Sequence, residues 1–118
     1  MPTDDKNCAL SEKRCQACRG GVEPLAGATL EAYRGQLDPA WEIRNETLLE
    51  RTFTFRNFQQ ALDFTNTVGR LAEDEGHHPE ITLTWGRATV RLWTHKIGGL
   101  HENDFILAAK IDRLRDIV

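Results

Sequence analysis

His77 and His78 are adjacent and stand before Pro79, in a chain that contains only four histidines. Imidazole without neighbours titrates at about pH 6.5, so it can both donate and accept a proton near neutral pH. Glu73 lies four residues before His77, so the two side chains would share one side of a helix. Groups of these types could act as acid and base on a small polar substrate.

Further residues of the same kind follow the proline. The next predicted element is an antiparallel hairpin, which returns His95 toward the histidine pair. Asp104 comes nine residues after His95, near the start of the last predicted helix. Imidazoles and carboxylates from three elements could therefore meet in one place. His101 has no partner at a comparable spacing, and we expect it to be a helix-start or surface residue.

Two other interpretations of the histidine pair stay open. The first is that the pair consists of solvated polar residues at the end of a helix, with no chemical role. The second is a zinc or iron site. Metal-binding helices place their ligands at i and i+4, whereas adjacent histidines at a helix end point in diverging directions. We therefore expect no metal.

The cysteines lie in the first 20 residues, as Cys8, Cys15 and Cys18. The last two form a CxxC pair, but a closed zinc site needs four ligands and no histidine lies nearby. A redox pair of the thioredoxin type would follow a strand, and none is predicted there. An odd cysteine count fits a reducing cytosol better than a disulfide framework. We expect reduced thiols in a loosely ordered segment.

The elements that must position the histidines follow from periodicity and chain breakers. Residues 1–27 read as an N-terminal extension with the CxxC pair, and residues 28–118 read as one domain. The expected elements are a short helix from Thr29 to Leu37, two strands within residues 40–55 around a turn at Asn45-Glu46, a helix from Asn57 to Gly76, a hairpin of residues 81–85 and 88–95 joined at Gly86-Arg87, and a C-terminal helix within residues 101–118.

This order of elements predicts an α+β fold, with a four-stranded antiparallel sheet and helices packed on one face. The uncovered face would be a subunit contact or a solvated site. Arg51 interrupts the apolar face that Leu49 and Phe53 share, so that strand is expected near an edge of the sheet. Gly69 weakens its helix by about 1 kcal/mol relative to alanine, which favours close packing at that point.

Composition narrows the class of protein. The chain has 118 residues with 15 basic and 18 acidic side chains, a formal net charge of −3. A nucleic-acid binder would normally show a basic face, so we expect no nucleic-acid partner. No apolar run approaches the roughly 20 residues of a membrane span, and the polar start lacks the apolar centre of a secretory signal. We expect a cytoplasmic protein with no membrane contact.

The histidine pattern and its flanking segments resemble one known family. The residues that carry the resemblance are Glu73, His77-His78-Pro79, Trp85, Thr94-His95 and Asp104, together with the segments TFRNFQQALDFTNTVG and GLHENDFILAAKID. This pattern is similar to the signature of the pterin-4a-carbinolamine dehydratases, over residues 38–113. The segment CQACRGG resembles leaders of bacterial members.

The resemblance implies the same α+β fold, assembled as a homodimer or homotetramer. It implies dehydration of 4a-hydroxytetrahydrobiopterin to quinonoid dihydropterin and water, which recycles the pterin cofactor of aromatic amino acid hydroxylation. The implied bacterial partner is phenylalanine hydroxylase. One group must protonate the leaving oxygen and another must accept the proton of N5. Because this chemistry requires no metal, hydride carrier or covalent nucleophile, no cofactor is expected.

The resemblance also implies roles for single residues. His77, His78 and His95 are the implied catalytic and pterin-contacting set. Within it, His77 and His95 would be the proton-transfer pair, and His78 would hold the pterin. Glu73 is the implied orienting carboxylate, and Asp104 would fix His95 or the last helix.

Pro79 and Trp85 complete the implied substrate-binding set, with Trp85 as an aromatic wall for a flat heterocycle. Ile81 stands where many relatives carry an aromatic residue, which changes the expected shape of the pocket. Two alternatives to this dehydratase remain. One is a non-catalytic protein-binding or dimerisation cofactor of the same fold, as some animal members are for a homeodomain transcription factor. The other is a dehydratase of another pterin, such as a molybdopterin-related compound.

Overall fold

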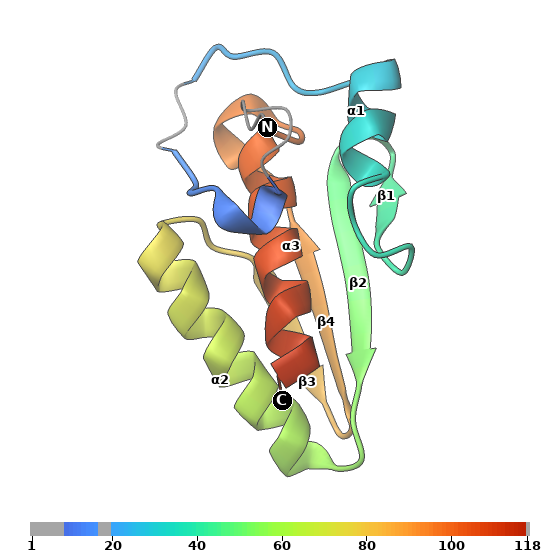
Figure 1. The fold of residues 1–118 in the computed structure, drawn as a ribbon, viewed down its shortest axis with the longest axis vertical. Helices are drawn as coiled ribbons and strands as arrows, with labels where there is room; N and C mark the ends of the chain where they lie inside the picture. The colour runs from blue at the N-terminus through green and yellow to red at the C-terminus, as the bar shows by residue number, and fades with distance from the viewer. Residues whose placement is uncertain (1–8, 17–19, 118) are drawn as a thin grey trace.

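The computed structural model describes residues 9–16 and 20–117, and it contains a four-stranded antiparallel sheet in the order β1-β2-β4-β3. Its elements are η2 (Leu10–Glu12), α1 (Gly27–Arg34), β1 (Glu42–Arg44), β2 (Leu48–Thr54), α2 (Phe58–Glu75), β3 (Glu80–Thr84), β4 (Arg87–Leu92), η3 (His95–Ile97) and α3 (Glu102–Ile117). Helices α2 and α3 lie across one face of the sheet (Figure 1). The predicted α+β fold class is confirmed.

The hydrophobic core lies between this face of the sheet and the helices. Apolar side chains from every layer are fully buried there, including Leu49 and Phe53 of β2, Val90 and Leu92 of β4, Phe64 and Val68 of α2, and Phe105 and Ile111 of α3. Alternate residues of β4 are buried, as expected for a strand with one covered face. The core therefore fixes which ends of α2, β4 and α3 come together.

Strand β2 lies inside the sheet, between β1 and β4, so the expected edge position is wrong. Arg51 lies on the covered face, where its Nη1 donates to Asp112 Oδ1 at 2.8 Å. Its guanidinium also lies 4.3 Å from the ring centroid of Phe53. An interior strand can carry this arginine because a carboxylate on α3 pairs with it. The predicted turn at Asn45 and Glu46 is confirmed, with φ values of 53° and 60°.

The hairpin of β3 and β4 turns one residue earlier than expected. Thr84 pairs with Arg87, so the turn residues are Trp85 and Gly86 instead of Gly86-Arg87. Gly86 has a φ of +72°, a value that glycine adopts without strain. This register leaves Trp85 at the tip of the hairpin, at the opposite end of the sheet from the start of α3 (Figure 1).

Helix α2 has the predicted boundaries. The Asn57 side chain accepts the Gln60 N–H at 2.8 Å, and Gly76 ends the helix in the left-handed conformation. The close packing expected at Gly69 is wrong, because a side chain there would meet no described atom within 4 Å. Helix α1 starts two residues before Thr29 and stops at Arg34, three residues short of Leu37.

Helix α3 begins with a reciprocal cap. The ring Nδ1 of His101 accepts the Asn103 N–H at 3.0 Å, and the His101 N–H donates to Asp104 Oδ2 at 3.0 Å. The prediction that His101 is a helix-start residue is confirmed. The cap also fixes the backbone that carries Asp104.

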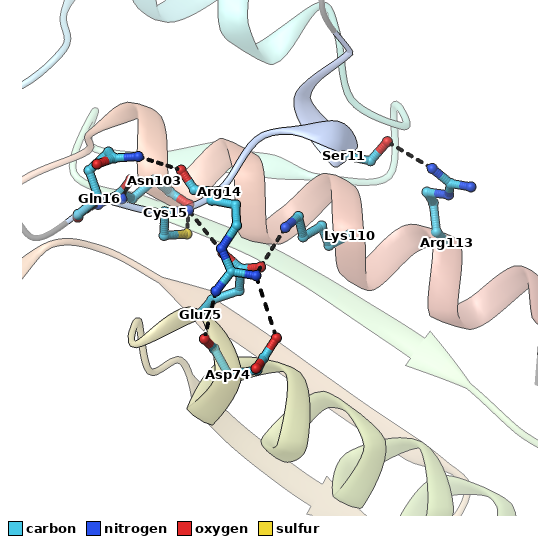
Figure 2. Close-up of polar contacts among 9 residues, drawn as sticks. All are labelled: Ser11, Arg14, Cys15, Gln16, Asp74, Glu75, Asn103, Lys110 and Arg113. Atoms are coloured by element: carbon cyan, nitrogen blue, oxygen red, sulfur yellow. Dashed lines mark hydrogen bonds and ion pairs between the residues drawn. The ribbon is translucent and has the colours of Figure 1, made fainter.

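Residues 9–16 of the N-terminal extension pack along α3 (Figures 1 and 2). We call this stretch the N-terminal segment. Leu10 is buried in the core, and Lys13 pairs with Glu102 at 2.7 Å. A loosely ordered segment was the expectation for this part of the chain, and these contacts differ from it. Cys8 and Cys18, the second cysteine of the predicted CxxC pair, lie outside the described residues.

Candidate active site

An open cavity of about 500 Å³ lies where the C-terminal end of α2, the end of β4 and the first turn of α3 meet. The side chains that line it include Gln16, His77, His78, Trp93, His95 and Asn103. We call it the histidine cavity. The structure therefore brings all three predicted histidines to one space.

Backbone geometry explains this convergence. Gly76 reverses the chain after α2, and the His77 N–H donates to Ala72 O at 3.2 Å. Strand β3 then pairs Glu80 with Arg91 on β4. Continuing that register past both strand ends brings the histidine pair level with Trp93 and Thr94, and His95 follows directly.

His77 is held by a buried carboxylate. Its Nε2 lies 2.6 Å from Asp104 Oδ1, and the exposed fractions of the two side chains are 13% and 0%. The other oxygen of Asp104 accepts the Thr94 hydroxyl at 2.9 Å and the His101 N–H at 3.0 Å. Asp104 therefore pairs with His77, and not with His95 as the resemblance had left open, while it also caps α3.

His78 is held at the surface. Its Nε2 lies 2.6 Å from Glu73 Oε2, with side chains that are 61% and 78% exposed. Glu73 thus orients His78 from one turn back in α2. An exposed pair of this kind is screened by water and contributes little to stability.

His95 is held by an indole. Trp93 Nε1 donates to His95 Nδ1 at 3.3 Å, and the two rings are nearly perpendicular, with centroids 4.9 Å apart. Trp93 is a site residue that sequence reasoning missed. Its place two residues before His95 on an alternating strand was the available signal.

The hydrogen bonds differ in the ring nitrogen they use. The carboxylate of Asp104 requires a proton on Nε2 of His77, which leaves Nδ1 as the second exchangeable position. The indole N–H of Trp93 requires a lone pair on Nδ1 of His95. His77 is therefore held through Nε2 and His95 through Nδ1.

The two remaining predicted site residues do not join the histidines. Pro79 and Trp85 are not among the described residues that line the cavity. Pro79 separates the histidine pair from β3, and Trp85 is 70% exposed at the tip of the hairpin. Within this chain, Trp93 is the indole at the cavity.

Gln16 and Asn103 were also missed. Gln16 reaches the cavity from the N-terminal segment, and Asn103 precedes Asp104 on α3. No local pattern indicates that residues so far apart in sequence meet. Within residues 9–16 and 20–117, no group of histidine, cysteine and acidic side chains is arranged to hold a metal ion. None of the helices described here has the length and apolarity to cross a membrane.

Comparison with known proteins identifies the family. The model of the family described as "Pterin 4 alpha carbinolamine dehydratase" matches residues 23–114. A protein of Rubrobacter xylanophilus named "Putative pterin-4-alpha-carbinolamine dehydratase" is 56% identical over 105 residues, which cover 89% of this chain and 97% of the relative. A protein of the same name from Methylococcus capsulatus is 51% identical over 108 residues, covering 91% of this chain and 94% of the relative.

Solved structures agree with this assignment. A "transcriptional coactivator/pterin dehydratase" from Brucella melitensis superposes with a TM-score of 0.73 at 28% identity, over 78% of this chain and 98% of that one. A "pterin dehydratase-like protein" described as a RuBisCO assembly factor has a TM-score of 0.55 at 23% identity, covering 64% and 88%, and shows the shared fold. This α+β chain with its histidine cavity belongs to the pterin-4a-carbinolamine dehydratase family.

Proposed function

We propose that this protein dehydrates 4a-hydroxytetrahydrobiopterin to quinonoid dihydropterin and water by histidine acid–base catalysis. The observation that carries the proposal is the meeting of His77, His78 and His95 around one cavity, each with a different hydrogen-bonding partner. Family membership supports the pterin as the substrate class.

The reaction needs two proton transfers. The C4a–O bond breaks as the N5 lone pair forms the C4a=N5 double bond, and a proton donated to the leaving oxygen makes it water. The N5–H proton then passes to a base. General acid and base groups each accelerate such steps by about 10²–10⁴-fold.

His77 suits the acid role. Its Nε2 is bonded to buried Asp104, which leaves Nδ1 as the ring nitrogen that can carry the proton transferred to the leaving hydroxyl. His95 suits the base role, because its Nδ1 accepts the Trp93 N–H and therefore carries a lone pair. The 3.3 Å Trp93 contact is long, so a substrate proton can displace it. His78, at the exposed rim, would hold the pterin.

The test is a stopped-flow assay in which phenylalanine hydroxylase supplies the 4a-hydroxypterin. The purified protein should accelerate dehydration above the uncatalysed rate, and His77→Ala and His95→Ala should each lower kcat by about 10²-fold. His101→Asn is the matched control, since asparagine also caps a helix and His101 caps α3. Wild-type protein that leaves the uncatalysed rate unchanged would overturn the proposal.

In the cell, we infer a role in recycling the cofactor of phenylalanine hydroxylase, as a homodimer or homotetramer. The solved structure described as a "transcriptional coactivator/pterin dehydratase" makes a non-catalytic scaffold the competing function. A scaffold does not need the His77–Asp104 pair. If His77→Ala still binds phenylalanine hydroxylase and still supports hydroxylation in the cell as well as the wild type does, the scaffold role would be favoured.

A further inference from the structure

The N-terminal segment contributes a residue to the histidine cavity. Gln16 lines the cavity together with Glu75 and Asn103. The family match begins at residue 23, so this residue lies outside the matched region. Figure 2 shows the segment reaching over the C-terminal end of α2 and along α3.

The backbone of Gln16 is fixed by a buried side chain. Asn103 is 2% exposed, its Oδ1 accepts the Gln16 N–H at 2.9 Å, and its Nδ2 donates to Gln16 O at 2.6 Å. One carboxamide thus satisfies both backbone groups of a single residue. Asp104, the next residue of α3, holds His77. One turn of α3 therefore positions Gln16 and His77 together.

A buried carboxylate anchors the residue before Gln16. Glu75 is 7% exposed, its Oε1 accepts the Cys15 N–H at 2.9 Å, and its Oε2 pairs with the Lys110 ammonium. Burial alone would raise the pKa of Glu75, but the Cys15 N–H and Lys110 outweigh it and leave this pKa below its ordinary value. Because the carboxylate stays charged, the segment is tied to both α2 and α3 (Figure 2).

The Gln16 side chain itself is exposed, and its groups can reach a ligand. Its amide nitrogen lies 3.5 Å from Arg14 O, longer than an ordinary N–H···O bond, so a better partner can replace this contact. A carboxamide offers one donor beside one acceptor. That pair matches a ring nitrogen beside an exocyclic amino group, as when glutamine reads adenine.

We propose that Gln16 is a substrate-binding residue that recognises the 2-amino group and adjacent N1 of the pterin, with Asn103 and Glu75 as positioning residues. The ligand class rests on the proposed function. The bond pattern predicts that Gln16 donates to N1 and accepts from the 2-amino group. Asn103 cannot take this role, since both ends of its carboxamide hold the Gln16 backbone.

The test compares two ligands by isothermal titration calorimetry, 7,8-dihydropterin and its analogue without the 2-amino group. Wild-type protein should bind the first about 10-fold more tightly, since the analogue loses the hydrogen bond from the 2-amino group and leaves the Gln16 carbonyl oxygen without that donor. In Gln16→Met, which keeps the size of the side chain, the ratio of the two dissociation constants should fall to about 1. Gln36→Met is the control, because Gln36 is an exposed glutamine beyond α1.

A ratio in Gln16→Met equal to that of the wild type would overturn the proposal, as would a wild-type ratio near 1. Asn103→Ala should lower the ratio in the same way, because the Gln16 backbone loses both of its hydrogen bonds to the Asn103 side chain. Should that variant fail to fold, as judged by circular dichroism, the exposed Gln16→Met variant decides alone.

These outcomes separate the two proposals. Binding that depends on Gln16 without any acceleration of dehydration would leave this inference intact and overturn the proposed function. If the protein accelerates dehydration but the ratio of the two dissociation constants is the same in Gln16→Met as in the wild type, the proposed function stands and this inference is overturned.

Discussion

At the scale of single residues, the three cavity histidines differ in how firmly their rings are held. Asp104 is fully buried and has every oxygen engaged, so its bond to His77 is shielded from solvent. Glu73 and His78 are mostly exposed, and water competes for their bond. The same chemical pair therefore has different consequences at the two positions.

We expect Asp104→Asn to lower kcat for dehydration by about 10²-fold with little change in KM, because the buried side chain that holds the His77 ring loses its charge. Glu73→Gln is the matched variant at the surface and should change kcat by less than about 3-fold. Steady-state kinetics from pH 6 to 9 measure both. Equal losses in the two variants would contradict the distinction.

Cys15 should be an unreactive thiol. Burial, reinforced by the nearby Glu75 carboxylate, raises the pKa of Cys15 to about 12. Thiolate, the reactive form, is then scarce at pH 8. In a chain with Cys8→Ser and Cys18→Ser, iodoacetamide at pH 8 should label Cys15 at least about 10²-fold more slowly than it labels free cysteine. Mass spectrometry follows the reaction, and rapid labelling of the folded protein would refute the prediction.

Sequence reasoning placed the histidines well and the tryptophans poorly. His77 and His78 follow a helix whose stop is encoded by Gly76, so local signals fix where they lie. His95 was expected at the end of the second hairpin strand, but β4 ends at Leu92 and His95 begins η3, three residues further on. By alternation along the hairpin, Trp85 falls on the apolar face of its strand, and Trp93 falls on the face opposite Val90 and Leu92. Their exposure depends on which residues form the turn, a one-residue difference that periodicity does not resolve.

At the scale of elements, β2 and α3 are joined by a charged pair on the covered face of the sheet. Asp112 accepts Arg51 Nη1 at 2.8 Å and the Trp41 indole N–H at 2.9 Å. Burial nevertheless raises the pKa of Asp112 above its ordinary value, although the Trp41 and Arg51 bonds act in the opposite direction. The Trp41 and Arg51 bonds therefore offset only part of the cost of burying the Asp112 charge.

Arg51→Met should destabilise the protein by about 3 kcal/mol at pH 7, since it leaves Asp112 buried without its cation. A raised folded-state pKa means that stability is gained below the unfolded pKa, about 3.9, and lost as pH rises through the folded pKa. The deficit of Arg51→Met should therefore shrink at pH 4. Urea unfolding at both pH values measures it.

The double variant Arg51→Met with Asp112→Asn supplies the control, because it removes the buried charge along with its partner. It should recover most of the stability at pH 7. A deficit that stays constant with pH, or that the second substitution does not relieve, would contradict this account of the pair.

Elements were predicted from sequence more securely than their places in the sheet. Asn57 and Gly76 bound α2 through local backbone chemistry that reads directly from residue types. The interior position of β2 did not follow, because Arg51 looks like an edge residue until Asp112, 61 positions later, is known to meet it. The partner of a buried charge is a tertiary fact.

At the scale of the whole molecule, Glu75 joins three parts of the chain. It belongs to α2, accepts the Cys15 N–H from the N-terminal segment and pairs with Lys110 of α3. Arg14 Nη1 also lies near this carboxylate, 3.7 Å from Glu75 Oε2. This one residue therefore couples the packing of the segment to the end of the helix that precedes His77.

Glu75→Gln should lower the free energy of unfolding by about 2 kcal/mol at pH 7, because Lys110 loses its buried partner. The folded pKa of Glu75 lies below its ordinary value, with burial opposing and the Cys15 N–H and Lys110 prevailing. Stability from such a group is present above the unfolded pKa, about 4.3, and lost as pH falls through the folded pKa. The difference between the wild type and Glu75→Gln should thus narrow from pH 7 to pH 3.

Urea unfolding across that range checks the narrowing, with Glu31→Gln on the exposed surface of α1 as the control. If the wild type and Glu75→Gln have the same free energy of unfolding at pH 7, the Glu75 carboxylate does not stabilise the packing of the N-terminal segment, α2 and α3.

The arrangement of one four-stranded sheet with helices on one face was predictable from the sequence. Alternating apolar residues indicate the strands, and apolar residues at helical spacing indicate the helices. The N-terminal segment was not predictable in this way, because its CxxC pair drew attention to thiol chemistry. Its contacts run through Leu10, Lys13 and Gln16 to α3, about 90 residues away by position, and no local pattern reports such a distance.

The packing of residues 9–16 on α3 has a consequence for synthesis of the chain on the ribosome. Arg113 donates a hydrogen bond to Ser11, and Lys13 forms a salt bridge with Glu102. Residues 9–16 therefore cannot pack until α3 has been synthesised. A nascent chain released before α3 is made would lack the Asn103 side chain that binds the Gln16 backbone and the Asp104 carboxylate that binds His77. Premature termination before α3 should thus yield a chain that cannot complete the histidine cavity.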